Sequence, residues 1–204
     1  MMNPELSAAI VHDLKNALGL IEGELELMAR RDDASERIRF LWQHAAGMRL
    51  RLMEFLTLYQ DDLQALPVSI DEQVLSEFLT QVCGALVSPS GPELSVVIED
   101  DLRIAYFDAR LVSLALQSAL SNARAFARTE IILGVRRVYK SLVFFVADDG
   151  PGPNSGPTPG GTGLGMKVCQ LVARAHSTGT SAGYCALNRR APAGGAVFEL
   201  SLPQ

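Results

Sequence analysis

The sequence predicts an α+β protein in which a helical hairpin precedes an α/β sandwich. Two long stretches near the start of the chain repeat apolar residues at alternating spacings of three and four, which indicates amphipathic helices. Further on, short apolar segments alternate with helical ones, as expected for a mixed sheet with helices on one face. We therefore expect a helical unit over residues 1–64 and a sheet-containing unit over residues 65–204.

The composition excludes several classes of protein. The chain has 204 residues, of which 48% are hydrophobic, and its net charge is -5 at pH 7. This acidic balance gives no electrostatic case for binding nucleic acid or an anionic membrane. No apolar run is long enough to cross a bilayer. The three cysteines have no CxxC spacing, so we expect free thiols in a reducing cytoplasm rather than disulfides or a zinc site.

The two predicted helices form a hairpin. The first is expected over residues 4–31, and the second begins after Ser35, a candidate N-cap. Their apolar positions are Val11, Leu14, Leu18, Ile21, Leu25 and Met28, and then Ile38, Leu41, Ala45, Met48, Leu52, Phe55 and Tyr59. A hairpin cannot cover its own apolar stripes, so we infer a homodimer with a four-helix bundle, although the second unit could also cover them.

The second unit is expected to alternate strands and helices. Strands are predicted at 68–70, 94–99, 103–107, 130–139, 142–147, 184–188 and 196–202, and helices at 71–87, 108–128 and 164–176. The strands at 94–99 and 103–107 are close enough along the chain to form a hairpin. The strand at 142–147 is almost continuously apolar, so we expect it at the centre of the sheet.

The first candidate site is a histidine on the first helix. His12 lies just off the apolar stripe, with Asp13 beside it and Asn16 one turn further on. Gly19 and Gly23 continue the same surface line. Glycine inside a helix costs about 1 kcal/mol relative to alanine, so two glycines here need a reason. We hypothesise that the missing side chains on this line let another protein pack closely against the helix beside His12.

Most single histidines on helices are surface or capping residues. His44 and His176 are expected to be of this kind. His12 differs for two reasons. Asp13 can orient its ring or accept its proton, and a glycine-rich segment follows later in the chain.

That glycine-rich segment is the second candidate site. Asp148 and Asp149 end an apolar strand, and a helix opens further on. The glycines next to the strand end are Gly150 and Gly152, and those at the opening of the helix are Gly161, Gly163 and Gly165. Backbone N–H groups of such glycines and of a helix N-terminus bind phosphate oxygens. The Gly-x-Gly-x-Gly spacing excludes a Rossmann fingerprint, and no Gly-Lys-Ser/Thr follows as in a P-loop. The acidic strand end favours a nucleotide site over a flexible linker.

In this order, the motifs resemble those of the sensor histidine kinases of two-component systems, over nearly the whole chain. His12-Asp13-Leu-Lys-Asn16 is similar to their phosphoacceptor box, and residues 108–123 are similar to the helix that carries their N box. Asp148-Asp-Gly150-Pro-Gly152 is similar to their G1 box. Residues 161–166 resemble the G2 box, and residues 195–203 resemble the last strand of the family.

For the first unit, the resemblance implies a dimeric phosphoacceptor hairpin. His12 would be the phosphorylated nucleophile, and Asp13 would orient or deprotonate it. Asn16 would position a water molecule for removing phosphate from a partner. The partner implied is the receiver domain of a response regulator.

For the second unit, the resemblance implies a sandwich of the GHKL ATPase type with ATP and Mg²⁺ as cofactors. Asn122 would help to hold Mg²⁺, and Asp148 would bind the adenine amino group. Residues 150–165 would surround the phosphates, with contacts from Gly150, Gly152, Gly161, Gly163, Leu164 and Gly165. Arg124 and Arg128 are candidate phosphate partners, although either can simply be solvated. Such a set fits phosphoryl transfer, which depends on in-line positioning and charge neutralisation.

The sequence also departs from the family's pattern. Ala17 stands where a proline usually follows the phosphoacceptor box, so no helix kink is expected. Ser118 replaces the first asparagine of the N box, and Ala125 replaces the downstream lysine. Only residues 153–160 separate the two glycine boxes, and this segment is much shorter than the family's usual ATP lid. A short lid covers little of a nucleotide.

Two functions follow from these features. The first is a histidine kinase that phosphorylates His12 from Mg-ATP, takes its signal from another protein and passes the phosphoryl group to a response regulator. The alternative is a dimeric histidine phosphotransferase with a degenerate nucleotide domain that relays phosphate from a hybrid kinase. A kinase-like module that only sequesters a partner is a third option, which the phosphoacceptor helix disfavours. Since few residues precede His12 and none follow Gln204, we expect no built-in sensor, membrane anchor or receiver domain.

Overall fold

The computed structural model describes residues 4–31, 34–64, 66–84, 91–99, 101–153, 163–179, 181–190 and 194–204, with the backbone alone for residues 4–12. The chain divides into two compact units, Met1–Leu56 and Thr57–Gln204. Helix α2 continues across this division, so the predicted boundary between residues 64 and 65 stays a prediction. In the described part of the chain, no helix combines the length and the apolar character that a membrane span needs.

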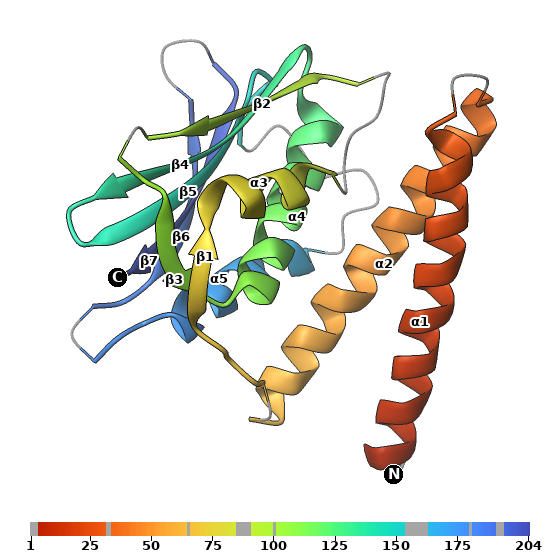
Figure 1. Cartoon of the computed structure of the whole chain (residues 1–204), viewed down its shortest axis with the longest axis horizontal. Helices are drawn as coiled ribbons and strands as arrows, with labels where there is room; N and C mark the ends of the chain where they lie inside the picture. The colour runs from red at the N-terminus through yellow and green to blue at the C-terminus, as the bar shows by residue number, and fades with distance from the viewer. Residues whose placement is uncertain are drawn as a thin grey trace. The chain divides into compact units, whose positions relative to one another are not determined.

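The first unit is a helical hairpin, as predicted. Helix α1 is Pro4–Ala29 and helix α2 is Glu36–Asp62, and the two lie side by side in Figure 1. Ser35 caps α2 as expected, because the Ile38 N–H donates to its Oγ at 3.4 Å. Arg49 of α2 forms a bidentate ion pair with the buried Glu22 of α1, with Nη2 3.2 Å from Oε1. This pair ties the two helices together across their apolar contact.

The apolar stripes of the hairpin are only partly covered within one chain. Leu18, Leu25, Ile38, Ala45 and Leu52 are buried or half-buried. The members that recur at every seventh position stay exposed, and they are Leu14, Ile21 and Met28 on α1 and Leu41, Met48 and Phe55 on α2. An apolar seam with a seven-residue repeat is typical of helices that pack in a bundle. The four-helix bundle itself stays a prediction.

The second unit is built on a five-stranded mixed sheet in the order β2-β4-β5-β7-β6. Its strands are β2 (Glu93–Ile98), β4 (Glu130–Val138), β5 (Ser141–Asp148), β6 (Tyr184–Arg189) and β7 (Ala196–Pro203). β2 runs parallel to β4, and the remaining neighbours are antiparallel. β5 is the central strand, as its continuous apolar sequence predicted, and both of its faces are therefore largely buried.

Three helices lie on the same side of this sheet in Figure 1, and α4 and α5 also pack against each other. They are α3 (Leu75–Gly84), α4 (Ala109–Phe126) and α5 (Leu164–Ala175). Phe78 of α3, Phe107 and Phe144 form an aromatic cluster with edge-to-face contacts, their ring centroids 4.8–5.9 Å apart. The α+β class is therefore confirmed, and the core of the unit lies between the helices and β5.

Two local predictions are wrong. No strand forms at 68–70; the strand is β1 (Asp71–Val74), so the following helix begins at Leu75 and not at residue 71. The predicted hairpin of 94–99 with 103–107 does not form either. β2 pairs with β4, whereas β3 (Ile104–Phe107) pairs with β1 in a separate two-stranded sheet. Tertiary pairing overrides the local signals here: Asp71 and Glu72 resemble the acidic first turn of a helix but pair with β3 instead. The end of the predicted helix, at 85–87, lies outside the described residues.

Candidate functional site

The candidate nucleotide site is organised around the last residue of the central strand. Asp148 ends β5 and is only 6% exposed. Its Oδ1 accepts hydrogen bonds from the backbone N–H of Gly150 at 2.8 Å and of Ala196 at 3.3 Å. Both bonds go to the same oxygen, so Oδ2 is the atom that can accept from a ligand. A buried carboxylate with one oxygen fixed is suited to bind a single donor such as an exocyclic amino group.

The glycines around Asp148 are required because backbone passes very close to them. A Cβ at Gly150 would lie 2.5 Å from the carbonyl oxygen of Phe126, at the end of α4. Gly152 has φ +90, and a Cβ there would lie 2.9 Å from the carbonyl oxygen of Gly195. Gly195 has φ +89, and its Cβ would lie 1.9 Å from the carbonyl oxygen of Asp148. The end of α4, the turn after β5 and the start of β7 therefore converge on one point.

Asp149 has a different task from its neighbour Asp148. Its Oδ1 accepts from the Arg128 N–H at 2.8 Å, and its Oδ2 accepts from the Thr129 hydroxyl at 2.6 Å and the Thr129 N–H at 3.0 Å. The Thr129 hydroxyl bond is the largest cause that lowers the pKa of Asp149 far below its usual range; desolvation opposes it, and the backbone donors lower the pKa further. Asp149 thus holds the connection between α4 and β4.

The second glycine box opens α5. Gly163 is the N-cap residue with φ +72, a conformation that favours glycine, and Leu164 and Gly165 are half-buried at the first turn. The N-terminus of a helix is the kind of element that can bind phosphate oxygens through its first backbone N–H groups. Gly161 lies outside the described residues.

The candidate residues of α4 are dispersed. Asn122 is exposed on the last turns of the helix, and Ser118, one turn earlier, is buried at 3% exposure. The guanidinium of Arg124 lies against Gly91, where a Cβ would be 3.2 Å from Nη2, and burial lowers the pKa of Arg124. Arg128 takes part through its backbone N–H, which binds Asp149. Asn122 and Arg128 are the exposed residues of this set, whereas Arg124 is half-buried and Ser118 is buried.

The three residues predicted as the phosphoacceptor site lie on α1. His12 is within this helix, but its side chain lies outside the described atoms, and Asp13 and Asn16 are exposed. The spacing of the three residues therefore places them on about one turn of helix. His44 is an exposed residue of α2, as predicted, with Nδ1 3.1 Å from the Phe40 carbonyl oxygen. His176 is the C-cap residue of α5, also as predicted, but it is buried.

Two further residues belong to the site and were not assigned a role from the sequence. Gly195 closes on Asp148, as described above. Arg189, the last residue of β6, brings its guanidinium against the first glycine box: a Cβ at Gly152 would lie 3.3 Å from its Nη1. Gly195 could have been found from the sequence, because two adjacent glycines, Gly194 and Gly195, precede the last strand. No local pattern marked Arg189, because only strand pairing brings it to this end of the sheet.

Comparisons with known proteins agree with this architecture. No protein-family model matches the sequence, and no curated protein matches it. Among solved structures, the histidine kinase AdeS of Acinetobacter baumannii superimposes with a TM-score of 0.61 at 15% identity, over 94% of this chain and 97% of that one. The chain has the fold of a histidine kinase.

Two other structures with the histidine-kinase fold cover the chain in complementary ways. The catalytic domain of the histidine kinase ThkA matches 66% of this chain and 95% of its own length, with a TM-score of 0.55 at 17% identity. Full-length ShkA in complex with AMPPNP matches 99% of this chain and 46% of its own length, with a TM-score of 0.64 at 21% identity. The expected fold class is thus confirmed, whereas the roles of individual residues stay predictions.

Proposed function

We propose that the chain is a histidine kinase that phosphorylates His12 from Mg-ATP and passes the phosphoryl group to an aspartate of a response regulator. The observation that carries this proposal is Asp148, a buried carboxylate fixed at the end of the central strand by Gly150 and Ala196. It stands in a chain with the histidine-kinase fold and a His-Asp pair on a separate helical hairpin.

The residues divide the reaction between the two units. Bound ATP supplies the terminal phosphoryl group, with ADP as the leaving group. A ring nitrogen of His12 attacks the phosphorus, and Asp13 orients the ring and takes the proton of the other nitrogen. Asp148 Oδ2 accepts from the adenine amino group, and the N-terminus of α5 with Gly163 and Gly165 binds phosphate oxygens. Positioning and charge neutralisation are the main requirements of phosphoryl transfer.

The residues present fit a magnesium ion that is bound mainly by phosphate. In the part of the chain that the structure describes, no cluster of three carboxylate, histidine or cysteine side chains could hold a metal by itself. Mg²⁺ often keeps several waters and takes only one or two protein ligands beside substrate phosphates. The exposed amide of Asn122 could be such a ligand. Magnesium would then bind together with ATP and not before it.

The relay function remains the second candidate because of specific residues. Ser118 is buried where the family's N box has an asparagine, and Ala125 replaces a lysine. The segment between the glycine boxes is short. A relay would keep His12 and lose useful ATP affinity, so phosphate would come from an upstream hybrid kinase. In either case we propose a homodimer, a cytoplasmic location and a receiver domain as the phosphate acceptor.

Labelled ATP with Mg²⁺ separates the two functions. For the kinase, we expect wild type to become labelled, His12→Gln to remain unlabelled and Asp148→Asn to lose most of the label. The Asp148→Asn change places an amide N–H₂ where a carboxylate oxygen accepts, and a bond to a charged group is worth about 1.5–3 kcal/mol, or a tenfold or greater loss of affinity. His44→Gln and the exposed Asp101→Asn are matched controls that should keep full labelling.

The outcome for the relay is different. Calorimetry would detect no ATP or ADP binding, and His12 would still accept phosphate from a phosphorylated receiver domain. If His12→Gln were labelled as strongly as wild type, both functions would be excluded, since both depend on the same imidazole.

A further inference from the structure

Arg189 lies on the same face of the sheet as Asp148, on the second strand along from it. Residues that pair across neighbouring strands share a face, and every second residue of a strand returns to it. The pairs that carry this face from β5 through β7 to β6 are Phe144–Leu200–Cys185 and Val146–Phe198–Leu187. Two residues further along β5 and β6 are Asp148 and Arg189. Because Phe144 contacts Phe78 of α3, this is the face that the helices cover (Figure 1).

The position of Arg189 along β6 places it at the level of Asp148 and not at the start of α5. Met166, in the first turn of α5, has its Sδ 3.8 Å from the Cys185 Sγ. Arg189 follows four residues later, which is about 13 Å along a strand. Its pairing partner on β7 is Ala196, whose backbone N–H binds Asp148 Oδ1. Arg189 is therefore close to the residue expected to take the nucleobase and remote from the helix end expected to bind phosphate.

The Arg189 side chain turns from the edge strand toward the first glycine box. A Cβ at Gly152 would lie 3.3 Å from its Nη1 and 3.4 Å from its Cζ. The guanidinium therefore fills the space that a side chain at Gly152 would need. The same turn holds Asp148, because the Gly150 N–H donates to its Oδ1 at 2.8 Å. The cation and the carboxylate thus both contact one short turn.

The guanidinium groups of Arg189 and its neighbour Arg190 differ in their contacts. Arg190 lies on the opposite face of β6, and its Nη2 is 3.0 Å from Glu130 Oε1 in an ion pair. Among the residues that the structure describes, the Arg189 guanidinium has no acceptor of this kind, and Asp148 does not pair with it. A guanidinium has five N–H donors and no acceptor. Donors that no described residue uses, next to the candidate site, are available to a ligand.

We propose that Arg189 is a specificity residue that donates a hydrogen bond to a ring nitrogen of adenine. The inference rests on the proposed function, because it adds a second contact to the nucleotide that Asp148 binds there. Asp148 Oδ2 can accept, and the Arg189 guanidinium can donate. Adenine offers both complements on one edge, since its amino group lies beside a ring nitrogen that accepts. A purine with a carbonyl oxygen in place of the amino group would turn an acceptor toward Asp148 and be rejected.

Arg189→Gln removes this contact without a large effect on the fold. Arg189 is exposed, so its replacement should leave the melting temperature unchanged. Glutamine keeps a polar side chain, but it is shorter and uncharged, so the charge-assisted hydrogen bond is lost. The matched control is Arg190→Gln, which makes the same change at the next residue, on the opposite face of β6.

Calorimetry with Mg²⁺ measures the binding of ATP and of its two deaza analogues, in which N1 or N7 of adenine is replaced by a C–H group. We expect Arg189→Gln to bind ATP about tenfold more weakly than wild type does, because a bond from a charged donor is lost. Wild type should bind one of the two analogues about tenfold more weakly than ATP. Arg189→Gln should bind that analogue and ATP equally, since the bond is already missing. Arg190→Gln should match wild type with all three nucleotides.

The results that would overturn this contact differ from those that would overturn the proposed function. An unchanged affinity of Arg189→Gln for ATP refutes the contact. So does a loss of affinity that is equal for ATP and both analogues, because it would indicate a contact with the phosphates or with the face of the base. In both cases wild type still binds ATP, and the proposed kinase stands. If wild type binds no nucleotide, the proposed kinase fails, and the adenine contact fails with it.

Discussion

At the scale of single residues, two adjacent aspartates show how the fold assigns chemistry. Asp148 points back to Gly150 and Ala196 and is buried, whereas Asp149 binds Arg128 and Thr129. Successive side chains at the end of a strand leave on opposite sides. The hydrogen bonds to Asp148 therefore go to its Oδ1, whereas both oxygens of Asp149 bind backbone N–H groups or the Thr129 hydroxyl.

The Gly194-Gly195 pair offers a controlled test of the site's packing. Both have positive φ, but only Gly195 closes on Asp148, while a Cβ at Gly194 meets nothing within 4 Å. We expect Gly194→Ala to lower the free energy of unfolding by about 1 kcal/mol for its φ alone. Gly195→Ala should lower it by at least about 2 kcal/mol more, because the backbone has to move. Urea unfolding measures both, and equal effects would contradict the close contact.

Asp149 makes stability depend on pH in the acid range. Its folded pKa is lowered, so its stabilising contribution is present above the unfolded value of about 3.9 and is lost as the pH falls below it. Thr129→Val removes the largest cause of the lowered pKa. We expect the urea midpoint of this variant to fall less between pH 7 and pH 3 than that of wild type. A fall as large as in wild type would show that the Thr129 hydroxyl does not stabilise the carboxylate.

At the scale of elements, α1 carries Gly19 and Gly23 on the same line as His12 and Asn16, the residues predicted to form the phosphoacceptor site. A Cβ at Gly19 or Gly23 would meet nothing within 4 Å, and each glycine weakens the helix by about 1 kcal/mol relative to alanine. Within the described chain, no close packing requires these two glycines. This agrees with the hypothesis that the two positions lack side chains so that a second protein can pack closely there.

Substitution of both glycines tests that hypothesis. Gly19→Leu with Gly23→Leu should slow phosphotransfer to the receiver domain tenfold or more, because bulky side chains hold the partner away from His12. The matched pair Gly19→Ala and Gly23→Ala should raise the melting temperature of the hairpin. Transfer from purified phosphorylated protein measures the effect. Leucine variants that transfer phosphate to every partner at the wild-type rate would refute the docking line.

At the scale of the whole molecule, the exposed heptad residues predict self-association. Leu41 and Met48 are 45% and 52% exposed in one chain, on the seam that a bundle would bury. We expect wild type to be a dimer by light scattering at micromolar concentration. Met48→Glu should be a monomer, because an unpaired charge is costly in an apolar interface. Val97→Glu, at a residue 49% exposed on β2, is the control and should leave the dimer intact.

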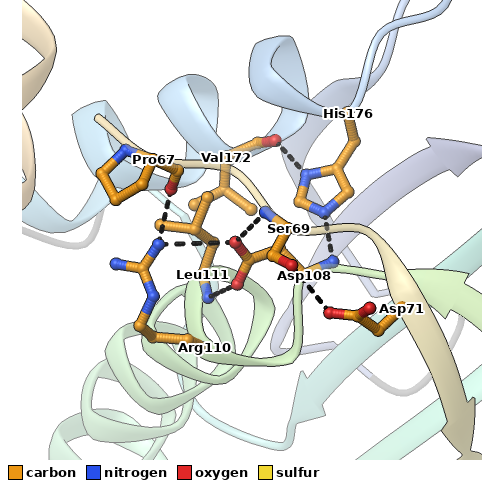
Figure 2. Close-up of polar contacts among 8 residues, drawn as sticks. All are labelled: Pro67, Ser69, Asp71, Asp108, Arg110, Leu111, Val172 and His176. Carbon is orange, nitrogen blue, oxygen red and sulfur yellow. Dashed lines mark hydrogen bonds and ion pairs between the residues drawn. The ribbon is translucent and has the colours of Figure 1, made fainter. Parts of the chain in front are cut away.

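The sequence by itself determined the elements and the motifs. Apolar periodicity and glycine positions are local properties, so the hairpin, the central strand β5, the helix that opens at Leu164 and the cap at Ser35 could all be predicted. The tertiary structure alone decided the pairing of β1 with β3, since non-local partners set which short polar segment becomes a strand. It also gave Asp148 and Asp149 different partners and brought Gly195 and Arg189 against the first glycine box. The His176 ring, likewise, accepts from the backbone N–H of the distant Asp108 (Figure 2). These contacts join residues distant along the chain, and their formation depends on packing that no local pattern encodes.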